Sequence, residues 1–124
     1  MEVSHTSRFW ESPAVQQLGQ FVRERQRAWH AARSTPSFEQ FEQELHPHVM
    51  ALERDLLAAE LARYDVDAPQ IEVAGVSYHP VWEDTETYLT AAGEVQVARH
   101  LYRPAGHNAK SLCPLELRVG IVDG

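Results

Sequence analysis

The fold of this chain is decided by residues 85–103, which read Thr85-Glu-Thr-Tyr-Leu-Thr-Ala-Ala-Gly-Glu-Val-Gln-Val-Ala-Arg-His-Leu-Tyr-Arg103. Two runs rich in Thr, Tyr, Val and Leu flank a short Ala-Ala-Gly-Glu segment. Such runs favour β-strands, and Gly93 can take a positive φ angle in the turn without steric cost. The stretch therefore predicts an antiparallel β-hairpin.

More strand is predicted upstream of this hairpin. Ile71-Glu-Val73 and Val76-Ser-Tyr78 are short runs separated by Gly75, and they follow the turn-like segment Asp65-Val-Asp-Ala-Pro69. Strand structure is then expected to continue to Arg103, and residues 104–108 are typical of a loop. We therefore expect a small antiparallel β-meander from residue 71 onwards.

An amphipathic helix is predicted at residues 12–33. Ser12 is a good cap for the free N–H groups of a first helical turn, and Pro13 is tolerated at the first helical position. Apolar residues then recur at helical spacing, with Arg25 on the same face: Val15, Leu18, Val22, Trp29 and Ala32.

A second, acidic helix is predicted from Phe38 to about Tyr64. Ser37 and Gln40 form a plausible capping box at its start. Pro47 removes a backbone donor, so we expect a kink or a restart near His46. The apolar stripe of this helix is the strongest periodic pattern in the chain: Phe38, Phe41, Leu45, Val49, Leu52, Leu56 and Leu61.

These elements predict an α+β fold, in which an N-terminal amphipathic helix pair is followed by a small antiparallel β-meander. Three segments are expected within one incomplete domain: an N-terminal helix and linker at 1–37, a long acidic helix and turn at 38–70, and the meander with a C-terminal apolar segment at 71–124. Two such helices joined by a short linker favour an antiparallel pair.

Length and composition are those of one ordinary globular domain, with 124 residues, 44% of them apolar. No apolar run approaches the roughly 18 residues that cross a bilayer. The single Cys and the start Met1-Glu-Val-Ser-His5 favour a soluble protein in a reducing cytoplasm. The net charge of −7 disfavours extensive nucleic-acid contact, but nine of the 18 acidic residues lie in residues 34–72, while residues 1–33 hold five Arg.

The region from Phe38 to Gly124 resembles the part that precedes the catalytic core in bacterial insertion-sequence transposases of the ISKra group. The resemblance rests on the Thr-rich strand, the Gly turn, the Val-x-Val-x-Arg-x-x-Tyr strand and the segment Leu112-Cys-Pro-Leu-Glu-Leu117. It extends upstream through Phe38-Glu-Gln-Phe-Glu-Gln-Glu-Leu45, Val49-Met-Ala-Leu-Glu-Arg-Asp-Leu-Leu57 and Asp65-Val-Asp-Ala-Pro69.

This resemblance implies a truncated transposase that lacks the acidic-triad domain. We then expect no catalysis by the chain alone, and an accessory role in binding DNA ends or in transposase assembly. The alternative is a stand-alone interaction module that dimerises through its helix pair, or that inhibits intact transposase by mixed assembly. The expected partners are DNA, bound weakly and in a salt-dependent manner, and a second copy or intact transposase; no membrane and no small-molecule substrate is expected.

The candidate DNA contacts are basic residues. Arg23 and Arg27, together with His30, are spaced to share one helix face, which suits phosphate contact. Pairing of this basic helix with the acidic second helix is the structural alternative. The full candidate set is Arg8, Arg23, Arg27, Arg99 and Arg103.

No metal, cofactor or catalytic residue is expected. His46 and His48 are two positions apart and point to different helix faces, whereas helical zinc ligands lie three or four apart. Cys113 sits among apolar residues, which favours an inert buried thiol. The aromatic residues are expected to serve as core and cross-strand packing: Trp10, Trp29, Trp82, Tyr78, Tyr88 and Tyr102.

The last apolar segment is expected to lack the element against which it packs. It would then fold back on the meander, associate with another chain or remain mobile, and we expect self-association or a disordered tail. Its members are Leu112, Leu115, Leu117, Val119, Ile121 and Val122.

Overall fold

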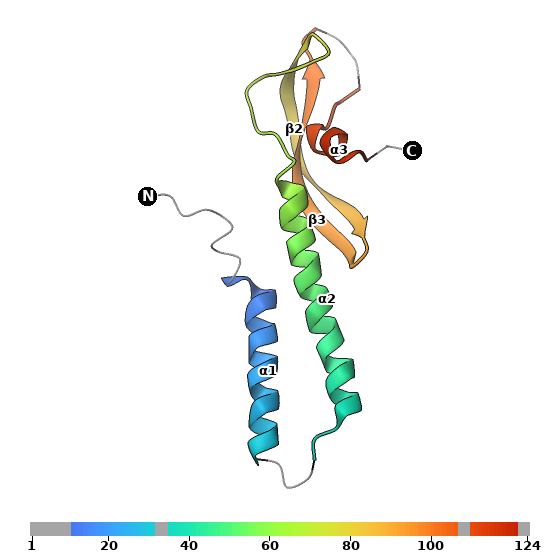
Figure 1. Cartoon of the computed structure of the whole chain (residues 1–124). Helices are drawn as coiled ribbons and strands as arrows, with labels where there is room; N and C mark the ends of the chain where they lie inside the picture. The colour runs from blue at the N-terminus through green and yellow to red at the C-terminus, as the bar shows by residue number, and fades with distance from the viewer. Residues whose placement is uncertain (1–10, 32–34, 107–109, 122–124) are drawn as a thin grey trace. The chain divides into compact units, whose positions relative to one another are not determined.

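The computed structural model describes residues 11–31, 35–106 and 110–121 and has the predicted α+β fold (Figure 1). Two helices, α1 (Pro13–Ala31) and α2 (Phe38–Ala62), precede the strands β1 (Ile71–Val73), β2 (Val76–Thr90) and β3 (Gly93–Pro104), and the short helix α3 (Pro114–Val119) follows. The chain forms two compact units, Met1–Asp55 and Leu56–Gly124, which divide within α2.

The helix starts have serine caps at the predicted positions, but only the Ser37 half of the expected Ser37–Gln40 capping box is found among the described residues. Ser12 Oγ accepts a hydrogen bond from the N–H of Val15 at 3.3 Å, and Ser37 Oγ accepts one from the N–H of Gln40 at 3.2 Å. The side chain of Gln40 donates to Glu44 at 3.0 Å. The serines thus satisfy one free backbone donor at each helix start.

A kink or a restart was expected near His46, and the restart is wrong, because α2 runs without a break through Pro47. Pro47 lacks the N–H that would bond the carbonyl of Gln43. Both residues are exposed, so water can satisfy that carbonyl. The cost of the missing bond is therefore too small to end the helix.

In the first unit, α1 lies antiparallel to the beginning of α2. The ring of Phe21 stacks on that of Phe41, with 5.6 Å between centroids, and lies 4.8 Å from the ring of His48. Arg25 donates to the carbonyl of Ser37 at 2.7 Å and places its guanidinium 5.0 Å from the Phe41 ring centroid. These contacts define the inner face of the helical hairpin.

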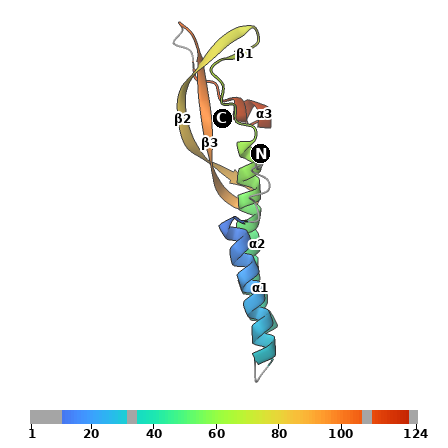
Figure 2. The same ribbon diagram turned by 90° about the vertical axis from the view of Figure 1, so that its left-hand side faces the viewer.

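In the second unit, the three strands form an antiparallel sheet in the order β1-β2-β3. β2 and β3 run side by side in both ribbon views (Figures 1 and 2). The hairpin turn is the predicted one, with Gly93 at φ 115° and Thr90 Oγ1 accepting from the N–H of Ala92 at 3.2 Å. One irregularity was not predicted: the register shifts at Val81, which forms a β-bulge.

The core of the second unit lies between β3, α3 and the last turns of α2. Its buried side chains are Val95, Val97, Cys113 and Leu115, against which residues including Ala58, Leu61 and Tyr64 pack. Tyr102 is fully buried; its hydroxyl donates to the carbonyl of Val66 at 2.6 Å and accepts from the N–H of Ala68 at 3.0 Å. Tyr102 thus fixes the connection between α2 and β1.

The C-terminal apolar segment divides in two. Leu115 is fully buried, whereas Leu117 and Val119 are exposed on α3, and Val122 lies outside the described residues. Gly120 ends α3 in the left-handed conformation, with its N–H bonded to the carbonyl of Glu116 at 2.9 Å. A glycine at this position is a common helix stop, so the segment contains both a packed turn and a closing signal.

Candidate functional site

The helical hairpin of the first unit buries very few side chains. Both helices are fully described, yet α2 contains no buried residue and α1 buries only Ala14. Most helical stability in proteins comes from packing an amphipathic face, rather than from the intrinsic helix propensity of the residues. A hairpin with so little buried surface therefore has an apolar face available for further packing.

Four large apolar side chains form this face, and they are called the apolar face below. They are Val22 at 39%, Trp29 at 57%, Phe38 at 74% and Val49 at 43% exposure. Single exposed apolar residues are ordinary on protein surfaces, but a contiguous group marks an interaction site.

Helical geometry places these four residues on one side of the hairpin. Each residue turns the helix by about 100°, so Val22 is displaced by that angle from the inner residue Phe21, and Val49 by the same angle from His48. Because the two helices run antiparallel, the same rotation along each chain brings Val22 and Val49 to the same side of the hairpin. Trp29 lies about two turns after Val22, and Phe38 about three turns before Val49, so both extend the same stripe.

The charges beside the apolar face differ between the two helices. On α1, the guanidinium of Arg23 folds back over Gly19, since a Cβ at Gly19 would lie 3.3 Å from an Arg23 nitrogen. On α2, the next positions round the helix carry Glu42 and Glu53, both exposed. One edge of the face is therefore basic and the other acidic.

Of the predicted DNA contacts, Arg23 and Arg27 are exposed on α1 together with His30. Helical spacing places all three on the side opposite Phe21. Neither arginine forms an ion pair with another residue in the described part of the chain. Arg103 is exposed on β3, and Arg8 lies outside the described residues.

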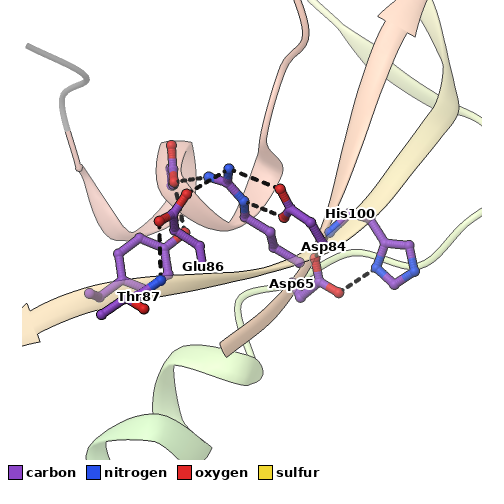
Figure 3. A network of polar contacts seen from close by, with 8 residues as sticks. Asp65, Asp84, Glu86, Thr87 and His100 are labelled. Carbon is purple, nitrogen blue, oxygen red and sulfur yellow. Dashed lines mark hydrogen bonds and ion pairs between the residues drawn. The ribbon is translucent and has the colours of Figure 1, made fainter. Parts of the chain in front are cut away.

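Arg99 has a different environment from these residues, because it is surrounded by carboxylates. Two of these carboxylates, Asp84 and Glu86, are labelled in Figure 3. Its Nε donates to Asp84 Oδ1 at 2.8 Å, its Nη2 lies 3.0 Å from Glu86 Oε2, and its Nη1 donates to Glu116. The side chain is only 14% exposed. Hydrogen bonds to Asp84 are the main reason that the pKa of Arg99 is raised above its ordinary value.

Glu116 also accepts a hydrogen bond from the Tyr88 hydroxyl at 2.7 Å. Burial, followed by this hydrogen bond, raises the pKa of Tyr88 well above its ordinary value. The network thus joins β2, β3 and α3 through charged groups that satisfy one another. The position of the hairpin turn indicates that Asp84 opposes Arg99, but no sequence signal indicates Glu116.

His100 forms a second link, between β3 and the segment after α2 (Figure 3). The backbone N–H of His100 donates to Asp65 Oδ1 at 2.8 Å, and the ring Nδ1 lies 2.6 Å from Asp65 Oδ2. Its Nε2 lies 3.6 Å from Asp67 and 3.7 Å from Glu83. The pKa of His100 is raised, chiefly by the hydrogen bond to Asp65.

The aromatic residues were expected to serve as core and cross-strand packing, and a place in the core is wrong for two of them. Trp29 and Trp82 are largely exposed, because Trp29 lies beside the inner face of the helix pair and Trp82 follows the bulge at Val81. Tyr102 is buried as expected, Tyr78 and Tyr88 are half-buried, and Trp10 lies outside the described residues.

Cys113 is the buried thiol that the sequence predicts. Burial raises its pKa, which disfavours the reactive thiolate. Among the described residues, no three His, Cys, Asp or Glu side chains are grouped so as to hold a metal ion. Nor does any helix there have the length and apolarity to span a membrane.

Comparison of the chain with protein-family models, with curated proteins and with solved structures gives no match.

Proposed function

We propose that this chain is a protein-interaction module whose helical hairpin pairs with a second copy of the same chain. The apolar face of Val22, Trp29, Phe38 and Val49 carries this proposal. Complete burial of one such side chain stabilises by about 1.5–3 kcal/mol. Packing two of these faces together would form a four-helix bundle, the usual way in which amphipathic helix pairs bury their stripes.

The charged edges favour one arrangement of the two copies. If α1 of one copy lies beside α2 of the other, Arg23 faces the edge that carries Glu42 and Glu53. If like helices are neighbours, acidic edges meet each other. Opposite charges at the rim guide orientation and specificity more than they add affinity, so we propose that α1 pairs with α2 of the second copy.

Sedimentation equilibrium of the full chain over a concentration series tests the proposal. We expect a dimer, and the Trp29→Gln/Val49→Gln variant should become monomeric, since both changes place polar groups in the interface. Gln17→Ala is the matched control, because Gln17 is exposed and outside the apolar face. A monomeric wild-type chain, or a dimer that survives the double substitution, would contradict the proposal.

A second candidate function is the accessory DNA-end binding implied by the resemblance to ISKra-group transposases. Arg23 and Arg27 favour it, because both are exposed and neither forms an ion pair with another described residue. Binding should then be weak and salt-dependent, because few phosphates are contacted, and should fall in Arg23→Ala/Arg27→Ala. Binding that is unchanged in this variant would remove the assignment. In both candidates the chain acts without catalysis, and the free thiol of Cys113 suits the cytoplasm that we propose as its location.

A further inference from the structure

A hollow of about 430 Å³ lies beside the β-bulge in the second unit. It is lined by Val81, Trp82, Leu101, Arg103 and Ser111. Trp82 is opposite Leu101 in the strand register, directly after the bulge residue, and its side chain remains 64% exposed. The volume falls within the range of small-molecule sites.

Arg103 is the polar group of this hollow, and its environment contrasts with that of Arg99 on the same strand. Arg99 is paired with three carboxylates. Arg103 donates its Nε to Ser111 Oγ at 3.2 Å and pairs with no carboxylate of the described residues. This bond orients the guanidinium and leaves its outer N–H groups to donate to a ligand. Such a pair of N–H groups suits a carboxylate.

The surroundings of Arg103 are also basic. His79 is its partner in the strand register, and Lys110 precedes Ser111 in the chain. In a protein of net charge −7, Arg103 and Lys110 place positive charge beside the hollow. The exposed indole of Trp82 adds a flat apolar surface on which an aromatic ring can stack.

We propose that this hollow binds a small aromatic carboxylate. The ring packs on Trp82 and Leu101, and the carboxylate accepts hydrogen bonds from the outer N–H groups of Arg103. A nucleic-acid strand fits less well, because it needs several phosphate contacts and the overall charge repels it. The proposal is independent of self-association through the helical hairpin.

Indole-3-acetate is the probe, titrated into the full chain while the indole N–H signals are followed by ¹H–¹⁵N NMR. A ligand of this size in a shallow site should bind with a Kd on the order of 1 mM. The Trp82 signal should move and the Trp29 signal should not. Neutral indole-3-acetamide should bind at least about fivefold more weakly, because it lacks the charge that Arg103 recognises.

Arg103→Gln should weaken binding by a similar factor. Arg63→Gln is the matched control, since Arg63 is an exposed arginine directly after α2 that lies outside the hollow. Trp82→Leu should reduce binding further. Equal affinity for the acid and the amide, equal movement of Trp29, or no shift up to about 10 mM ligand would each overturn the proposal. The acid–amide comparison needs no variant, so it holds even if Arg103→Gln perturbs folding.

Discussion

The guanidinium of Arg99 on β3 lies directly across the hairpin from the carboxylate of Asp84 on β2, with 2.8 Å between Nε and Oδ1. The same guanidinium bonds Glu116 of α3. One cation thus holds the short helix against the hairpin, and its removal would leave three carboxylates close together. Removing one member of a partly buried ion pair costs more than the pair itself contributes, because the remaining charges lose their compensation.

We therefore expect Arg99→Met to lower the free energy of unfolding by about 2 kcal/mol. The value is below that of a fully buried pair, because water can partly replace Arg99 at Asp84 and Glu86, whose side chains are 34% and 43% exposed. Urea unfolding measures the change. Arg63→Met is the control, since the pair of Arg63 with Glu60 at 3.6 Å is exposed, and this change should cost less than about 0.5 kcal/mol.

In Arg99→Met, replacing Glu116 by Gln should restore part of the lost stability, because it removes one of the unpaired charges. The two changes are then strongly non-additive in a double-mutant cycle. Additive losses would mean that the Arg99–Glu116 contact contributes nothing to the fold.

The sequence predicted the secondary structure well where local rules apply. Ser12 and Ser37 begin the two helices, and the turns at Gly75 and Gly93 separate the strands. The exposed position of Trp82 was not predicted, because an alternating sequence pattern does not reveal the bulge at the preceding residue, Val81. Arg99 was also placed among the DNA contacts, because the spacing of basic residues does not show that a carboxylate from α3 lies next to one of them.

Tyr102 offers a second stability test. Its buried hydroxyl bonds the carbonyl of Val66 and the N–H of Ala68. Tyr102→Phe leaves both groups without this partner, and a buried polar group without a hydrogen bond costs about 1–3 kcal/mol. We expect that loss in urea unfolding. Tyr78→Phe is the matched control on β2, because no hydrogen bond of the Tyr78 hydroxyl is found among the described residues; equal losses in both variants would remove the role assigned to the Tyr102 hydroxyl.

The third prediction concerns pH and His100, whose pKa is raised by Asp65. The charged imidazole is favoured in the folded state, so its contribution is fully present below the ordinary pKa of about 6.5 and is lost as pH rises through the raised value. The groups that face the ring, Asp65, Asp67 and Glu83, are all carboxylates. The stability gap between wild type and His100→Asn should therefore narrow as the pH rises.

Unfolding measured from about pH 5.5 to about pH 9 tests this prediction. His79→Asn is the control, because His79 is an exposed histidine of β2 that pairs with no carboxylate of the described residues. A gap between wild type and His100→Asn that stays constant over this range would show that the ring acts only as a neutral hydrogen-bond donor.

The last prediction concerns the tight turn between β1 and β2. Ala74 has a φ of 51° and Gly75 a φ of 79°. Two residues with positive φ are typical of the type I′ turn, which prefers Asn-Gly. The Cβ of an ordinary L-residue makes the left-handed conformation unfavourable by about 1–2 kcal/mol, and Asn tolerates it better than Ala. Ala74→Asn should therefore stabilise the fold by roughly 0.5–1 kcal/mol, seen as a higher urea midpoint with an unchanged slope.

Ala91→Asn is the control for this prediction. It lies in the β2–β3 turn, where its φ is not positive, and should bring no such gain. Because Ala74 is exposed, its side chain packs against little, and an equal gain at both positions would assign the effect to Asn itself rather than to relief of backbone strain.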